Sequence, residues 1–319
     1  MTDPTTALVL GATGGIGSEM ARALVARGWK VRALHRDPLS IATPIPGVEW
    51  IRGDAMNRAE VVAAAEGAAL IVHGVNPPGY RNWRGLALPM LANTIAAAAA
   101  SGARIFFPGT VYNFGPDAFP LVAEDAPQRP ATRKGAIRVE MEQALRDASE
   151  RGVRVLILRG GDWFGPRSSA NSWFGAMVRA GRRVTSVTYP GRRMVGHAWA
   201  YLPDVAETAM QLIAREAELP PFGMFHFGGH WFDRGVGMAE AVRAAAGDPH
   251  LPIRRFPWWL IWLASPFVET FREMLEMTYL WRVPVRLDNR RLVAFLGAEP
   301  HTPTVEAVRA TLQGMGSLA

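Results

Sequence analysis

The chain has 319 residues, which is enough for one large α/β domain with an appended lobe, or for two domains. Its hydrophobic fraction of 49% supports a sizeable core, and its lack of cysteine excludes disulfides and cysteine-ligated metals. The formal net charge of +7 comes from scattered arginines without a nucleic-acid motif, so we expect no nucleic-acid partner.

The start of the chain gives no sign of export. Met-Thr-Asp-Pro contains neither a basic region nor an apolar leader. No run reaches the ~20 apolar residues that a spanning helix needs. We therefore expect a cytoplasmic protein without a membrane span.

The first predicted elements form a strand–turn–helix–strand unit. The apolar run Leu8 to Leu10 is typical of a strand buried on both faces. A glycine-rich turn follows, then apolar positions at helical spacing up to Gly28, then a second strand from Val31. Glycine adopts tight-turn angles at low cost, and free amides at a helix start favour an anion. We predict that this turn holds the pyrophosphate of a dinucleotide, rather than being an ordinary turn, through Gly11, Thr13, Gly14, Gly15, Ile16 and Gly17.

The end of the second strand bears on the choice of cofactor. NAD-binding proteins usually place an acid there, whereas NADP-binding proteins place a cation for the extra phosphate. This strand ends in His35 and Arg36, and a guanidinium suits a phosphate. Asp37 would be the acid if the register slipped by one residue, and Arg36 would otherwise be a solvated charge. We predict that NADP(H) is preferred over NAD(H).

The turn has the spacing Gly-x-x-Gly-x-x-Gly. This spacing resembles the extended or atypical short-chain dehydrogenase/reductases, which include the NAD-dependent epimerases and dehydratases. The resemblance covers nearly the whole chain and implies an α/β fold with a doubly wound parallel (Rossmann) sheet of about seven strands. It also implies a dinucleotide-binding domain over residues 1–160, completed by about 184–228. A smaller interleaved C-terminal substrate lobe would use residues 161–183 and 229–319.

Apolar runs predict the next elements along the chain. We expect strands over 48–51, 68–75, 104–110 and 154–159, and helices near Arg58, over 88–101 and near Thr132. In the resembled family an aspartate after the third strand lies near the adenine, so Asp54, beside Ala55, is the candidate. Asp54 would alternatively cap the following helix. Asn76, after the fourth strand, would bond a ribose hydroxyl or the substrate, or simply form a turn.

The predicted helix near Thr132 carries the main departure from the family. The family uses Tyr-x-x-x-Lys, whose spacing places both side chains on one helix face. The gapless match puts Lys134 and Arg138 at these positions. Arg138 would still position the ribose, while Lys134 would transfer a proton if burial or nearby cations lowered its pKa. Lys134 would otherwise bind an anionic group, and both residues would otherwise be exposed helix cations.

The fifth strand also lacks a family feature. It normally supplies a catalytic serine, but here Thr110 is the nearest hydroxyl and Tyr112 follows it. The resemblance therefore implies Lys134, Arg138, Thr110 and Tyr112 as the catalytic candidates.

The loop after the sixth strand resembles the family's Arg-Pro-x-x-x-x-Gly-Pro loop, which meets the nicotinamide and opens the substrate lobe. Including residues from other loops, the expected substrate contacts are Tyr80, Asp162, Trp163, Phe164 and Trp199. We expect His197 to be a packed or loop histidine, and Asp204 to be a helix N-cap.

The rest of the lobe is predicted from shorter patterns. We expect strands over 184–189, 225–227 and 253–256, and helices over 238–246 and near the C-terminus. Residues 257–280 combine helical spacing with surplus aromatic residues, beginning with Trp258 and Trp259. A membrane-surface helix is one interpretation. Because acids nearly balance bases there, a buried lobe helix or a lid on an apolar pocket is favoured.

The sequence thus predicts an NADP(H)-binding oxidoreductase acting on a small, partly apolar carbonyl or hydroxyl substrate. A non-enzymatic NADP(H) sensor or binding protein is one alternative, favoured by the missing tyrosine and lysine. A nucleotide-sugar-like epimerase or dehydratase is another. No ligand cluster predicts a metal, and a homodimer is compatible with the family.

Overall fold

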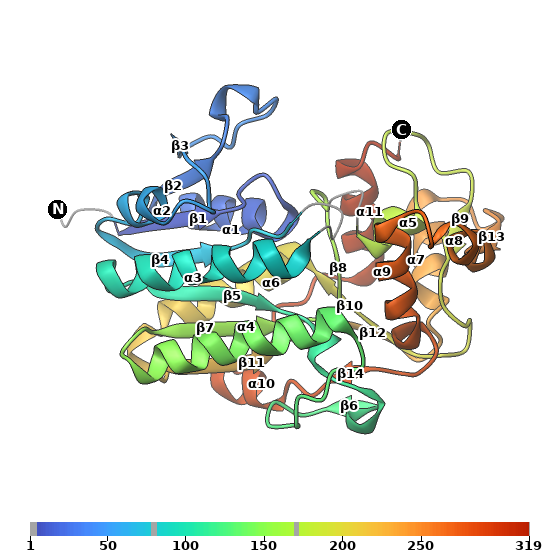
Figure 1. Cartoon of the computed structure of the whole chain (residues 1–319). Coiled ribbons are helices and arrows are strands. Elements are labelled where there is room, and N and C mark those ends of the chain that lie inside the picture. Colours follow the sequence, from blue (N-terminus) through green and yellow to red (C-terminus); the bar gives the residue numbers. More distant parts are fainter. Residues whose placement is uncertain (1–4, 78–81, 169–171, 319) are drawn as a thin grey trace.

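The computed structural model describes residues 5–77, 82–168 and 172–318, and its centre is a seven-stranded sheet (Figure 1). The strands run in the order β11-β7-β5-β4-β1-β2-β3, and each neighbouring pair is parallel. Their bounds are β1 (Thr6–Leu10), β2 (Lys30–His35), β3 (Val48–Arg52), β4 (Ala68–His73), β5 (Arg104–Gly109), β7 (Val155–Arg159) and β11 (Phe222–His226). The predicted doubly wound sheet is confirmed.

Helices bury both faces of this sheet. Alternate residues of β1 pack on opposite sides: Ala7 and Val9 join one core, Leu8 and Leu10 the other. The first core includes α1 (Gly15–Ala26) and α6 (Leu202–Ala214). The second includes α2 (Arg58–Ala64), α3 (Trp83–Ser101) and α4 (Arg133–Glu150), which lie in front in Figure 1. The order of strands reverses between β1 and β4, where open α/β sheets bind ligands.

The C-terminal lobe contains small sheets. Their strands are β8 (Asp162–Phe164), β10 (His197–Tyr201) and β12 (His230–Phe232) in one sheet, β9 (Val187–Tyr189) and β13 (Ile253–Arg255) in a second, and β6 (Leu121–Val122) and β14 (Arg286–Leu287) in a third. Within residues 184–228, β11 joins the large sheet and α6 packs on it, whereas β9 and β10 pair within the lobe.

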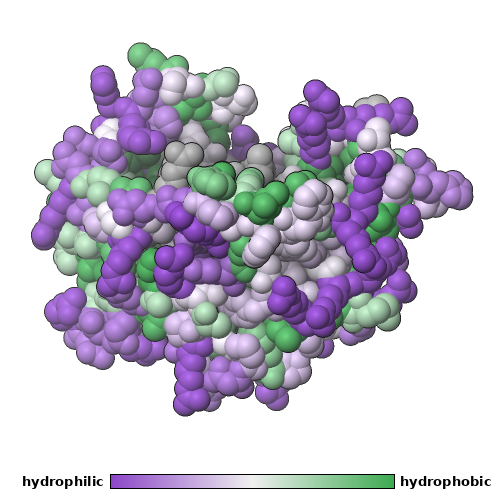
Figure 2. Space-filling view, turned by 45° about the vertical axis from the view of Figure 1, so that its right-hand side comes forward, coloured by the Kyte–Doolittle hydropathy of each residue, from purple (hydrophilic) through white to green (hydrophobic). Residues whose placement is uncertain are grey.

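Short helices complete the lobe and the end of the chain. They are α5 (Trp173–Met177), α7 (Gly237–Ala246), α8 (Trp258–Ala264), α9 (Glu269–Glu276), α10 (Arg290–Leu296) and α11 (Thr304–Gly314). None of the helices in the described ranges is long and apolar enough to cross a bilayer. The space-filling view is hollowed at its upper edge between the large-sheet part and the lobe (Figure 2).

Two helix predictions need correction. Helix α3 begins at Trp83 rather than at residue 88 and continues through Pro89, because the buried Trp83 indole donates to Asn76 Oδ1 at 2.8 Å and anchors the first turn. The prediction of a buried lobe helix within residues 257–280 is also wrong for α8. In α8 only Ile261 is buried, because α7 and α11 fill the lobe core instead.

Candidate functional site

The glycine turn brings three elements into backbone contact at the carboxyl end of β1. Gly11 has φ +85°, and a Cβ placed on it would lie 2.6 Å from the carbonyl carbon of Gly74, directly after β4. A Cβ on Gly17, in the first turn of α1, would lie 2.1 Å from the oxygen of Gly11. No side chain caps this helix, so its first-turn amides lack a side-chain acceptor. The turn therefore offers a bare backbone cradle for an anion.

Gly74 is a site residue that the sequence reasoning missed. A Cβ there would lie 2.9 Å from Leu10 O and 3.2 Å from the Cα of Gly17. The available signal was a single glycine directly after the apolar run of the fourth strand.

The carboxyl end of β2 presents Arg36. The guanidinium of the nearby Arg32 is already hydrogen-bonded within the protein: it donates to Ala64 O at 3.4 Å and to Glu66 O at 2.6 Å. His35 Nδ1 accepts from the Asp37 amide at 3.2 Å. The Arg36 side chain is exposed and makes no ion pair with any described residue. It remains available to a ligand.

The turn after β3 is held by hydrogen bonds with side chains of the turn and of α3. Asp54 Oδ1 accepts from the Met56 amide at 3.0 Å, and Ala55 O accepts from Asn93 Nδ2 at 2.9 Å. Asn57, not Asp54, caps α2 through the amides of its first turn. The alternative of Asp54 as the N-cap is wrong, since Asn57 stands directly before the helix.

The first turn of α4 packs on the segment that follows β5. Thr132 Oγ1 accepts from the Gly135 amide at 3.0 Å and caps the helix. A Cβ on Gly135 would lie 2.2 Å from Tyr112 O, so the two backbones touch. Thr110 and Tyr112 are thereby brought beside the helix turns that carry Lys134 and Arg138. The Thr110 hydroxyl is buried without a hydrogen-bond partner among the described residues.

A buried ion pair between β7 and α4 holds the segment that contains Thr110. Arg159 Nη2 lies 2.7 Å from Glu142 Oε2, with side-chain exposures of 0% and 5%. Arg159 Nη1 also donates to Thr110 O at 2.5 Å. A charge buried so deeply is tolerated only when it is paired and hydrogen-bonded. The pair therefore ties β7, α4 and the end of β5 together.

Lys134 is buried and paired with the lobe. Its side chain is 3% exposed, and Nζ lies 3.3 Å from Glu273 Oε2 and 3.2 Å from the Glu273 carbonyl oxygen. Burial lowers the pKa of Lys134, against the opposing effect of Glu273, and Arg133 adds a smaller lowering. The sequence reasoning named burial and cationic neighbours as the conditions for a lowered pKa, but it missed the partner on α9.

Arg138 is held at the carboxyl end of β5. Its Nη1 donates to Pro108 O at 3.4 Å, and its guanidinium lies over the rings of Trp83 and Phe107, 5.2 and 5.3 Å from their centroids. Burial, with the charge of Arg138, lowers the pKa of His73 to about 3, so this neighbour is neutral. A fixed cation thus stands beside the carboxyl ends of β4 and β5.

Asp162 and His197 form a buried pair in the lobe. Their Oδ2 and Nε2 atoms are 2.7 Å apart, and the His197 ring stacks on Trp281 with centroids 4.0 Å apart. Burial, and then the Asp162 charge, raises the pKa of Tyr189 and Tyr279. His197 is a packed histidine as expected, and Asp162 is its partner on the neighbouring strand.

The other predicted substrate contacts fall in different places. Phe164 and Trp199 are fully buried in the lobe core, with ring centroids 6.3 Å apart, so the structure does not place them on a pocket wall. Their strands pair, and the apolar rings fill the space between them. Trp163 is partly buried against the core of the large sheet. Tyr80 lies outside the described residues.

Asp204 lies in the first turn of α6 but does not cap it, because Tyr201 holds the N-cap position. Its carboxylate accepts from the amide and hydroxyl of Thr302, at 2.7 and 2.6 Å. It therefore ties α6 to the tail that leads into α11.

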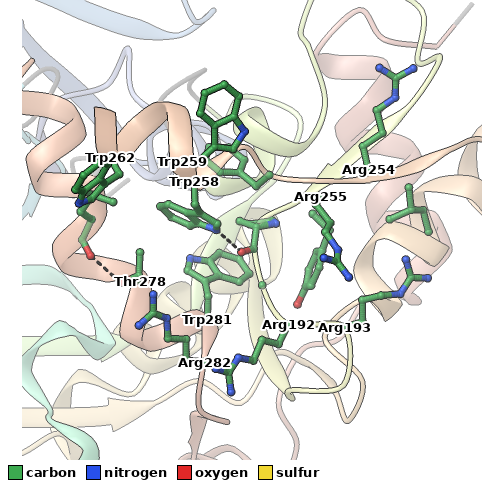
Figure 3. A pocket seen from close by; sticks show the side chains of 16 residues that line it. Arg192, Arg193, Arg254, Arg255, Trp258, Trp259, Trp262, Thr278, Trp281 and Arg282 are labelled. Atoms are coloured by element: carbon green, nitrogen blue, oxygen red, sulfur yellow. Dashed lines mark hydrogen bonds between the residues drawn. The ribbon is translucent and has the colours of Figure 1, made fainter. Parts of the chain in front are cut away.

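A cavity of about 930 Å³ lies in the lobe between β9, β13, α8 and the turn after α9 (Figure 3). Four tryptophans and five arginines line it: Trp258, Trp259, Trp262, Trp281, Arg192, Arg193, Arg254, Arg255 and Arg282. Helix α8 lies over this cavity as a lid on an apolar pocket would, and the arginines add positive charge to a largely apolar wall. In the described part of the chain, no three histidine, aspartate or glutamate side chains are grouped to hold a metal ion.

A family model and one curated relative match the sequence. The model of the NAD dependent epimerase/dehydratase family matches residues 7–228. A UDP-glucose 4-epimerase from Azospirillum brasilense is 33% identical over 181 residues. This matched segment spans 50% of the present chain and 50% of that epimerase.

Solved structures match over nearly the full length. A UDP-glucose 4-epimerase from Thermus thermophilus, in complex with NAD, has a TM-score of 0.74 at 21% identity, covering 98% of this chain and 99% of its own. A putative epimerase from Burkholderia cenocepacia has a TM-score of 0.76 at 18% identity, with the same coverage. At these identities the likeness establishes the fold.

Proposed function

The chain belongs to the NAD dependent epimerase/dehydratase family, and on this premise we propose that it is an NADP(H)-dependent oxidoreductase. Its substrate would be a small, partly apolar carbonyl or hydroxyl compound. The observation that carries the proposal is the close backbone packing at Gly11, Gly17 and Gly74, which a Cβ on any of them would disrupt, at the uncapped start of α1. A pyrophosphate fits such a cradle at a helix N-terminus.

The residues around the cradle suit the other parts of the cofactor. Arg36 would hold the extra phosphate of NADP(H), while Asp54 and Ala55 would lie at the adenine. Arg138, fixed over two aromatic rings, would position the nicotinamide ribose. When bound, the nicotinamide supplies or accepts hydride. The protein contributes the binding, the orientation and the proton.

Lys134 is the proposed proton-transfer residue. It occupies the family's tyrosine position, and burial lowers its pKa. Thr110, whose buried hydroxyl lacks a partner among the described residues, and Tyr112 would assist at the substrate oxygen. The cleft between the large sheet and the lobe would receive the substrate.

A nucleotide-sugar epimerase is the second candidate, favoured by the sequence likeness to the Azospirillum enzyme. The two functions differ in their use of cofactor. The oxidoreductase should oxidise NADPH when a carbonyl or enone compound is added. An epimerase should interconvert UDP-glucose and UDP-galactose without net change in the cofactor. Cofactor binding without turnover in either assay would favour the sensor alternative instead.

We expect Arg36→Ala to weaken NADPH binding about tenfold and to leave NADH binding unchanged, because one phosphate contact is lost. Energy transfer from the eleven tryptophans to bound nicotinamide measures both affinities. Arg309→Ala, an exposed arginine on α11, is the control and should change neither. Equal affinities of the unsubstituted protein for NADPH and NADH would contradict the proposed preference.

We expect Gly17→Ala to lower the affinity for NADPH and NADH alike, by at least about tenfold, because a Cβ 2.1 Å from Gly11 O must push the cradle apart. The same fluorescence titration measures it, with circular dichroism to verify folding. Gly28→Ala is the control: its φ is +76°, but no atom lies within 4 Å of the added Cβ. That variant should lose some stability and keep its affinity.

A further inference from the structure

Exposed apolar side chains gather on one short segment of the lobe. Of the twelve exposed large apolar residues in the described chain, six fall within residues 259–268: Trp259, Leu260, Trp262, Leu263, Phe267 and Val268. Trp262 is 68% exposed and Phe267 89%. We call these six residues the α8 patch. Single exposed apolar residues are ordinary, but a contiguous group indicates a binding surface.

Arginines flank the α8 patch. The five arginines of the neighbouring cavity come from the ends of β9 and β13 and from the turn after α9. Figure 3 shows Trp259 and Trp262 on one side of the cavity and Arg254 and Arg255 on the other. All five are exposed, and none forms an ion pair with a described residue.

In the described chain, the acids of this segment form no ion pair with these arginines, and the carboxylate of Glu269 accepts from the Asn82 amide at 3.4 Å. Glu273 pairs with Lys134 at 3.3 Å, and Glu276 pairs with Arg133 at 2.7 Å. Both glutamates are therefore committed to α4. The charge balance expected for residues 257–280 counts only that segment, whereas the five arginines come from outside it and gather beside the α8 patch in the folded chain.

An anionic bilayer surface matches this combination. Tryptophan, leucine and phenylalanine on a short helix enter the boundary between headgroups and acyl chains, while arginines bind headgroup phosphates. Helix α8 stands at the right-hand side of Figure 1, away from the large sheet. Docking there leaves the proposed cofactor cradle uncovered.

We propose that the α8 patch and its five arginines dock the protein reversibly on an anionic membrane surface. The attachment is peripheral: the apolar side chains enter the interface, and none of the described helices spans the bilayer. The arginines attract the anionic headgroups, an attraction that salt weakens, and the apolar side chains insert into the boundary between headgroups and acyl chains.

Flotation with lipid vesicles tests this proposal. The protein should float with phosphatidylcholine vesicles that contain phosphatidylglycerol, and not with phosphatidylcholine alone. High salt should release it. Brominated acyl chains should quench part of the tryptophan fluorescence, because Trp259 and Trp262 would lie at the interface.

Two variants separate the contributions. W262S/F267S should lose most of the quenching and at least about tenfold in vesicle affinity, and R254Q/R255Q should lose the preference for phosphatidylglycerol. Leu121→Ser and Arg151→Gln are matched controls, exposed on β6 and after α4, and should bind vesicles normally. Circular dichroism and NADPH titration should be unchanged in every variant, since all these side chains are exposed.

Three outcomes would overturn the proposal. The first is absence of binding to phosphatidylglycerol vesicles at low salt. The second is binding that W262S/F267S leaves intact. The third is a dimer in sedimentation that this variant dissociates while vesicles fail to bind, which would assign the α8 patch to a second copy of the chain.

Discussion

Replacing Lys134 by methionine should lower turnover about 10²- to 10⁴-fold while leaving NADPH affinity within about twofold, because a positioned acid or base contributes about this much to rate. Methionine keeps the length of the side chain but removes its proton. Glu273 keeps a partner in this variant, since Arg133 Nη2 also lies 3.3 Å from it. Steady-state kinetics measures the loss, with a carbonyl or enone compound that the unsubstituted protein reduces. Lys134→Tyr should restore part of the turnover.

The control is Arg133→Met, one residue earlier on α4. Arg133 pairs with the same acids of α9, but its side chain is 71% exposed. If Lys134 acts by proton transfer, this variant should retain nearly full turnover. Equal losses in both variants would instead mean that the contact between α4 and α9 matters, and not the lysine proton.

The pH profile gives an independent check. In the reducing direction Lys134 must carry its proton, so turnover should fall as the pH rises through its lowered pKa. This alkaline limb should be absent in Lys134→Met. A limb that persists in the variant would assign the titration to another group.

Glu142→Gln should destabilise the fold by about 3 kcal/mol, because it leaves the Arg159 charge buried without its counter-charge. Urea denaturation followed by circular dichroism measures the change in the free energy of unfolding. The loss should also loosen Thr110, whose carbonyl accepts from Arg159, so turnover should fall even where folding is complete.

Glu140→Gln is the matched control on the same helix. Glu140 pairs with Arg84 at 2.8 Å, but the two side chains are 45% and 65% exposed. An exposed pair is screened by water and contributes at most about 1 kcal/mol. Similar free-energy changes for the two variants would show that burial does not set the strength of the Glu142–Arg159 pair.

Much of the fold was predictable because its signals are local. The apolar strand, the glycines after it and the helical spacing up to Gly28 lie within a few turns of one another, so they define β1, α1 and β2 without knowledge of the rest of the chain. The same holds for the turn that contains Asn57, although the wrong side chain was chosen as the cap. Gly74 was predictable in principle, since it directly follows an apolar strand.

The positions of side chains in the lobe were less predictable, because a periodic pattern of apolar residues does not tell which of them lie in the core, on a pocket wall or on the surface. Phe164 and Trp199 carry the aromatic character expected of a pocket wall, but their strands pair and turn them into the core. Trp259 and Trp262 have the same character and are exposed, whereas residues of α7 and α11 belong to the lobe core.

The sequence by itself determined the family, the doubly wound sheet and the place of the dinucleotide turn, because each rests on short-range patterns of apolar residues and glycine. Only the tertiary structure decided which charges meet. Lys134 pairs with Glu273, Asp162 pairs with His197, and arginines from three segments gather beside α8. These contacts join residues far apart in the chain, so their distances follow from how distant segments pack, within the lobe and between the lobe and the large sheet, and not from any local pattern.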